Sequence, residues 1–142
     1  MAKTIVPSFM ASRKDHRHVV QSHPMRLSTI TRITQDVEQL TNYYETLLDR
    51  EPVEHNETIA LFDLGTVELF IHETYEPDAH DVPAEDYITF VVSDVDADYR
   101  RMTAEGATGI LEPAGYPWGQ SAYLRDPDGL MIELNDGNSG LD

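Results

Sequence analysis

Two segments far apart in the chain share one pattern, a turn between two short apolar runs with a single acid in the second run. The first spans Leu61 to Phe70 and carries Glu68; the second spans Ser121 to Asn135 and carries Glu133. In the second, Asp126-Pro127-Asp128-Gly129 forms the turn, because proline presets φ and glycine supplies the positive φ that closes it. Side chains alternate across a strand. The pattern therefore predicts two β-hairpins, each with one carboxylate on the face opposite its apolar neighbours.

A strand-like run ending in aspartate, and then a helical pattern, precedes each hairpin. The first run ends at Asp36, and apolar residues then recur at helical spacing over residues 37–48. The second run ends at Asp94 and is followed by the same spacing over residues 95–105. Both aspartates suit the N-cap position of a helix. With weaker strand signals between helix and hairpin, each half predicts the order βαβββ, which is an α+β fold made of two repeated units.

Short motifs in both halves occur in an order that resembles one known superfamily. They are Asp36, Asn42-Tyr43-Tyr44, Leu47-Leu48, Asp94-Val95-Asp96-Ala97, Gly106-Ala107, Pro117-Trp118-Gly119, Arg125-Asp126-Pro127-Asp128-Gly129 and Ile132-Glu133-Leu134. Their order resembles the vicinal oxygen chelate (VOC) superfamily of glyoxalase I, bleomycin-resistance proteins and extradiol dioxygenases. The resemblance implies that modules of about 26–75 and 86–136 form a curved, cup-shaped mixed sheet with the helices on its convex face. It also implies a homodimer.

The length and composition fit one domain preceded by an extension. A chain of 142 residues can bury one core, which we assign to residues 25–142, and residues 1–24 fit no part of the repeat. No apolar run is long enough to span a bilayer, so we expect no membrane partner and a cytoplasmic protein. The absence of cysteine excludes disulfides, thiolate nucleophiles and sulfur-ligated zinc.

The charge of the chain is strongly negative, with a formal net charge of −16 at pH 7. From Met25 onward there are six arginines, no lysine and 25 acidic residues, whereas the first 24 residues are net basic. An even acidic coat is typical of proteins from salt-loving organisms, in which it keeps the surface hydrated. The alternative is that the negative field attracts a cationic ligand. Either way, the field disfavours nucleic acid as a partner.

In the resembled superfamily the cup commonly holds a divalent metal with four protein ligands, two from the first strands and two from the last strands of the modules. Glu68 and Glu133 match the two last-strand places. Thr29 and Tyr87 occupy the other two, and neither is a good ligand for zinc, nickel or iron. The absence of histidine from these two places disfavours both glyoxalase I and extradiol dioxygenase activity. Two alternatives stay open, one divalent metal (Mg, Mn, Ni or Zn) held by the two glutamates, or none.

The remaining candidate residues favour a small-molecule ligand. Several hydroxyl and aromatic side chains fall on or near the concave face that the resemblance implies, and we take these as ligand-binding residues: Thr29, Thr31, Phe70, Tyr87, Trp118 and Tyr123. One hypothesis is a lyase or isomerase in which Glu133 and Glu68 move a proton, with or without a metal. The other is a metal-free protein that sequesters an aromatic or cationic compound. The sequence leaves open whether the protein is an enzyme and what its ligand is.

Overall fold

The chain folds into one eight-stranded sheet with two helices. The computed structural model describes residues 24–77 and 81–138. The predicted N-terminal extension, apart from Pro24, lies outside the described residues. The elements are β1 (Met25–Thr34), α2 (Val37–Leu48), β2 (Glu54–His55), β3 (Ile59–Asp63), β4 (Glu68–Glu73), β5 (Tyr87–Val92), α3 (Val95–Ala104), β6 (Thr108–Tyr116), β7 (Gly119–Arg125) and β8 (Met131–Asn135).

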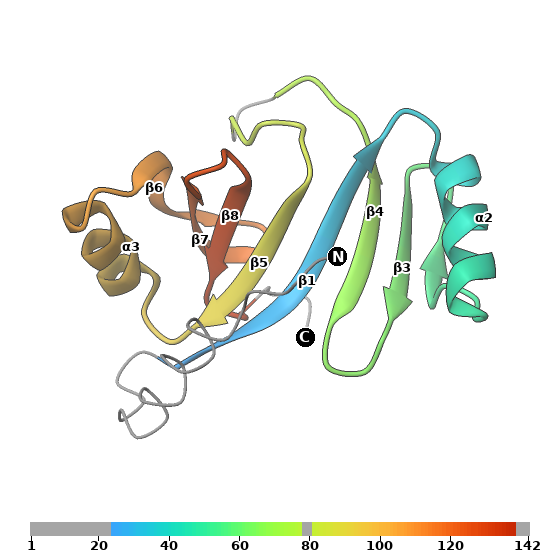
Figure 1. Ribbon diagram of the computed structural model, residues 1–142, viewed down its shortest axis with the longest axis horizontal. Coiled ribbons are helices and arrows are strands. Elements are labelled where there is room, and N and C mark those ends of the chain that lie inside the picture. Colours follow the sequence, from blue (N-terminus) through green and yellow to red (C-terminus); the bar gives the residue numbers. More distant parts are fainter. Residues whose placement is uncertain (1–23, 78–80, 139–142) are drawn as a thin grey trace, which may run out of the picture.

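The sheet joins two modules edge to edge. Its strand order is β2-β3-β4-β1-β5-β8-β7-β6, so β1 and β5, the first strands of the two modules, lie side by side in the centre and run antiparallel (Figure 1). Each first strand pairs in parallel with the last strand of its own module, β1 with β4 and β5 with β8. All other pairs are antiparallel. The predicted α+β fold of two βαβββ units in a mixed sheet is therefore confirmed.

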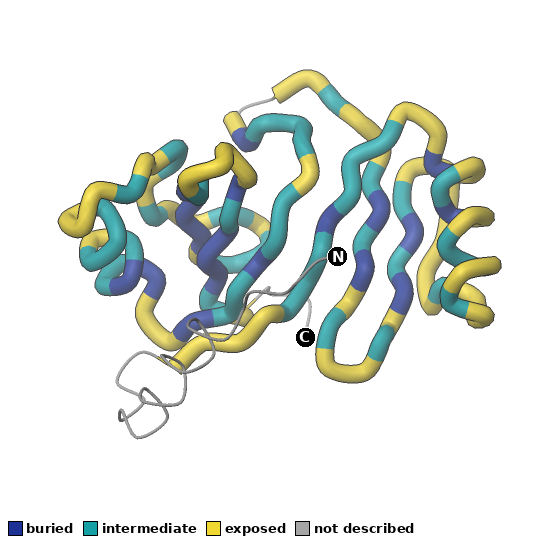
Figure 2. Tube along the Cα trace, viewed as in Figure 1, coloured by how far each residue is buried: buried dark blue, intermediate teal, exposed yellow. Residues whose placement is uncertain are grey.

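Helix α2 covers the first module from one side of the sheet. Asp36 caps it, because its Oδ1 accepts the amide hydrogen of Gln39 at 2.9 Å. Leu69 and Ile71, the apolar residues of β4 that alternate with Glu68, are buried (Figure 2) and pack in one core with Val37 of this helix. The buried core here consists of Val37, Ala60, Phe62, Leu69 and Ile71.

Helix α3 covers the second module in the same way. Asp94 caps it through Oδ1, which accepts from the amide of Ala97 at 3.0 Å. The buried core beneath α3 consists of Val92, Val95, Ala122, Leu124 and Leu134. Because the glutamates of β4 and β8 alternate with residues of these two cores, they point to the opposite side of the sheet. We call this side, away from both helices, the inner face.

The described part of the chain contains no helix that is both long enough and apolar enough to cross a bilayer.

Candidate functional site

The pairing of neighbouring strands brings several candidate residues into one row across the inner face. Thr29 of β1 pairs with Glu68 of β4 on one side and with Thr89 of β5 on the other. Thr89 in turn pairs with Glu133 of β8, which pairs with Tyr123 of β7. Residues opposite one another in register share a face. One row therefore carries residues from the first and last strands of both modules.

Glu133 is the centre of a buried hydrogen-bond network. Its side chain is only 5% exposed, and three hydroxyl groups donate to its carboxylate. Thr89 Oγ1 donates to Oε1 at 2.7 Å, while Ser121 Oγ and Tyr123 Oη donate to Oε2 at 2.6 and 3.1 Å. A carboxylate has about four acceptor positions. Among the described residues three donors reach this carboxylate, which leaves one position on Oε1 for a further donor.

A second layer of polar contacts fixes the donors of Glu133. Tyr123 Oη accepts a hydrogen bond from Trp118 Nε1 at 3.2 Å, which directs the tyrosine proton toward the carboxylate. Asn135 Nδ2 donates to Ser121 Oγ at 2.8 Å and to the Trp118 carbonyl at 3.1 Å. The network thus ties the β6–β7 turn, which contains Trp118, to the buried acid.

Aromatic rings surround this network. Tyr116 and Trp118 stack with ring centroids 4.7 Å apart and planes within 10° of parallel. The ring of Tyr123 lies edge-on to those of Tyr116 and Tyr87, with centroid distances of 6.0 and 6.3 Å. The rings pack around an apolar cluster whose buried members are Val82, Tyr123 and Met131. We call the four rings Tyr87, Tyr116, Trp118 and Tyr123 the aromatic group.

The electrostatics of the tyrosines depend on burial and on Glu133. Burial raises the pKa of Tyr87 and of Tyr123 above the ordinary tyrosine value, and the negative charge of Glu133 raises both further. The pKa of Tyr116 is raised by the same two causes. The three hydroxyls therefore remain protonated at neutral pH and can act as hydrogen-bond donors.

A second row, one step along the sheet, holds the other predicted ligand residues. Thr31 of β1 pairs with Phe70 of β4 and with Tyr87 of β5. Thr31 is buried. The ring of Phe70 meets the ring of His72 edge-on, with ring centroids 5.6 Å apart. These residues lie beside the row of Glu133, so the predicted set shares one face.

Glu68 lies apart from Glu133. It is exposed, and it is separated from Glu133 by three strand spacings, roughly 14 Å along the sheet. Among the described residues no hydrogen bond connects Glu68 to the network of Glu133. The structure therefore places the two glutamates on the same face but in different surroundings, one exposed and one buried.

A separate acidic hollow lies at the start of α2, among residues that include Asp36, Asn42, His55 and Glu73. It contains none of the predicted site residues. An acidic hollow on the surface is expected on a chain with this charge. We therefore take the Glu133 region, which is buried and hydrogen-bonded, as the candidate site.

Sequence reasoning missed three members of the site, Ser121, Tyr116 and Thr89. Ser121 stands two positions before Tyr123, and alternation alone would have placed both on the inner face. Tyr116 lies in the last position of β6, and its ring stacks on that of Trp118 in the β6–β7 turn. Thr89, rather than Tyr87, shares the row of Thr29 and Glu133; this depends on the register between β1 and β5, which spacing along the chain does not reveal.

Solved structures share this architecture. A protein from Legionella pneumophila described as an NAD-dependent benzaldehyde dehydrogenase matches with a TM-score of 0.60 and 22% identity, covering 79% of this chain and 97% of its own. A hypothetical protein from Bacillus halodurans matches with a TM-score of 0.61 and 16% identity, covering 78% and 93%. A variant of Streptomyces coelicolor methylmalonyl-CoA epimerase in complex with 2-nitronate-propionyl-CoA matches with a TM-score of 0.55 and 23% identity, covering 77% and 92%. At these identities the likeness concerns the fold.

The paired βαβββ modules and the row across the inner face define a class of proteins built on a duplicated unit. The sequence profile of the Glyoxalase/Bleomycin resistance protein/Dioxygenase superfamily matches residues 26–134. The chain belongs to this superfamily, the VOC superfamily that its motifs resemble. Comparison with curated proteins gave no match.

The residues present do not fit the metal that this superfamily commonly holds. The described residues include no group of three or more histidines, aspartates or glutamates placed to bind an ion. Of the four places in the row, Thr29 and Thr89 offer only hydroxyl oxygens. The carboxylate of Glu133 already accepts three hydroxyl hydrogens. The row therefore offers one hydrogen-bonded carboxylate at Glu133 rather than a set of metal ligands.

Proposed function

We propose that this VOC protein binds a small cationic organic compound, with Glu133 as the counter-charge and the aromatic group as the wall of the site. The observation that carries the proposal is the environment of Glu133, a buried acid that retains one acceptor position on Oε1. An ammonium or amidinium group could donate there. Such a group would bring the positive charge that this region lacks, since the described residues in direct contact with Glu133 are neutral.

The aromatic group supports the same class of ligand. A cation is attracted to the face of an aromatic ring, most strongly to tryptophan, when it lies within about 6 Å of the ring centre. Four rings from β5, β6, β7 and the β6–β7 turn lie around one carboxylate. A flat or aromatic cation would satisfy both features. The acidic surface adds an attraction at longer range.

The test uses the intrinsic fluorescence of Trp118, the single tryptophan of the chain. Benzylamine and benzyl alcohol have nearly the same size and shape but differ in charge. We expect benzylamine to change the fluorescence in a saturable titration and benzyl alcohol to bind at least tenfold more weakly. Equal binding of the two compounds would contradict a site built for positive charge.

Proton transfer is a second candidate, and the open acceptor position on Oε1 supports it as well. A carboxylate with such a position can accept a proton from a carbon next to a carbonyl. The protonated hydroxyl of Tyr87 would then donate a hydrogen bond to the negative oxygen that develops, whereas the hydroxyl of Tyr123 donates to Glu133. The test is incubation of carbon acids such as acyl thioesters in deuterated water with the wild type and with Glu133→Gln. Loss of the carbon-bound proton signal only with the wild type would favour an enzyme over a binding protein.

A further inference from the structure

The segment Asp81–Asp86, between the two modules, carries one apolar residue into the site. Val82 is 7% exposed and packs in the cluster with Tyr123 and Met131. Tyr123 is almost fully buried and Glu133 is buried as well. A ligand that reaches the open position of Glu133 therefore requires part of the surrounding structure to move.

The strands around Glu133 are poor candidates for this movement. β5, β8 and β7 are held to one another by continuous backbone pairing over at least five residue pairs at each junction. The segment Asp81–Asp86 belongs to no helix or strand. Among the described residues, this segment forms one backbone hydrogen bond, which runs from the Glu85 amide to the Pro83 carbonyl at 3.1 Å. Elements with few backbone bonds open at lower free energy than the sheet.

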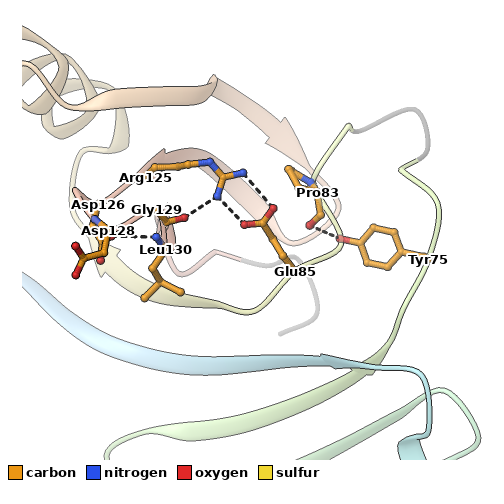
Figure 3. Close-up of polar contacts among 8 residues, drawn as sticks. All are labelled: Tyr75, Pro83, Glu85, Arg125, Asp126, Asp128, Gly129 and Leu130. Atoms are coloured by element: carbon orange, nitrogen blue, oxygen red, sulfur yellow. Dashed lines mark hydrogen bonds and ion pairs between the residues drawn. The ribbon is translucent and has the colours of Figure 1, made fainter.

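Side chains hold this segment in place from three directions. Arg125 at the end of β7 contacts Glu85 with both terminal nitrogens, at 2.6 and 3.1 Å. Tyr75 Oη donates to the Pro83 carbonyl at 3.1 Å (Figure 3). Asp86 accepts from Arg32 Nε at 3.0 Å and from the Ile33 amide at 2.8 Å. Both ion pairs are partly exposed to solvent, and such pairs contribute little each.

Arg125 is fixed on its other side by the turn that follows β7. Its Nη1 also donates to the carbonyl of Gly129 at 2.8 Å. The turn is itself closed by Asp126, whose Oδ1 accepts the amides of Asp128 and Leu130, both at 2.9 Å. Figure 3 shows the guanidinium between this turn and Glu85. The carboxylate of Glu85 thus attaches the segment, through Arg125, to the hydrogen-bonded turn that follows β7.

We propose that the segment Asp81–Asp86 is a movable wall of the Glu133 site, seated by the Arg125–Glu85 ion pair and plugged by Val82. The proposal rests on the proposed function for the identity of the ligand. Arg125 and Glu85 are positioning residues, since they act on the site through Val82. Weakening the ion pair should increase the fraction of time for which the aromatic group is accessible, and so speed ligand entry.

Two variants and one matched control test the movable wall. Glu85→Gln breaks the ion pair at a position outside the aromatic group, and Val82→Ala removes the plug. Asp96→Asn breaks the exposed Arg100–Asp96 pair on α3 with the same change in charge. Acrylamide quenching of Trp118 reports the accessibility of the site without any ligand. Stopped-flow fluorescence gives the association rate of benzylamine.

We expect severalfold faster association and stronger quenching in Glu85→Gln and Val82→Ala, with Asp96→Asn unchanged from the wild type. The loss of a negative charge in Glu85→Gln would slow a cation through the long-range field, so faster entry cannot come from that field. Unchanged quenching in both variants, or an equal rise in Asp96→Asn, would overturn the proposal. If benzylamine binds to none of the proteins, the proposed ligand class fails, and the quenching alone decides whether the wall moves.

Discussion

At the scale of single residues, the two repeated glutamates have become different. Glu133 accepts three hydroxyl hydrogens in a buried setting, whereas Glu68 is exposed at the equivalent place of the other module. We expect Glu133→Gln to lower the free energy of unfolding by about 2 kcal/mol, because an amide nitrogen would face hydroxyl donors. Glu68→Gln is the control and should change it by less than about 0.5 kcal/mol. Urea denaturation measures both, and equal effects would contradict the assignment of distinct roles.

The buried tyrosines predict a loss of stability at alkaline pH. Burial and the charge of Glu133 raise the pKa of Tyr87 and Tyr123 in the folded state, so the unfolded chain releases these protons first. Stability is then full below the ordinary tyrosine pKa of 10.0 and falls as pH rises above it. Each such tyrosine contributes a slope of about 1.4 kcal/mol per pH unit. Denaturation between pH 9 and 11 should show a shallower fall in Tyr123→Phe than in the wild type.

At the scale of elements, the fold could be predicted because local signals and alternation agree. The helix predicted over residues 37–48 has these bounds in the structure, and Asp36 and Asp94 cap the two helices as expected. The site was less predictable. Alternation placed Glu133 on the inner face, but the register that brings Thr89 beside it, and the turn that folds Trp118 toward Tyr123, depend on contacts between distant segments.

The cap of α3 gives a prediction at this scale. Asp94→Ala removes the acceptor for the Ala97 amide and should lower the free energy of unfolding by about 1 kcal/mol. Asp94→Asn keeps an acceptor oxygen and should retain most of the stability. Chemical denaturation of the two variants provides the comparison. An equally large loss in both would mean that the charge near the helix start, rather than the hydrogen bond, stabilises α3.

At the scale of the whole molecule, the net charge of −16 is the dominant feature. Self-repulsion of the acidic surface opposes compaction, and salt screens it over about 10 Å at 0.1 M ionic strength. We expect the midpoint of thermal unfolding to rise by several degrees as KCl increases from 0.02 to 0.5 M. Sucrose at matched osmolality is the control for solvent exclusion. A midpoint that does not respond to KCl would show that repulsion is already balanced within the fold.

The homodimer implied by the resemblance stays a prediction at this scale. Light scattering coupled to size-exclusion chromatography, at low and at high salt, measures the mass in solution. A dimer that forms only at high salt would identify repulsion between acidic surfaces as the barrier to pairing. A single mass near 16.1 kDa under both conditions would contradict the prediction.

The most direct test of a metal-free cation site at Glu133 is calorimetric titration of benzylamine into the wild type, with and without prior removal of metals by a chelator, and into Glu133→Gln. The account predicts the same affinity before and after chelation and at least tenfold weaker binding to the variant, if that variant remains folded by circular dichroism. Binding that disappears on chelation, or that is unaffected in Glu133→Gln, would contradict it.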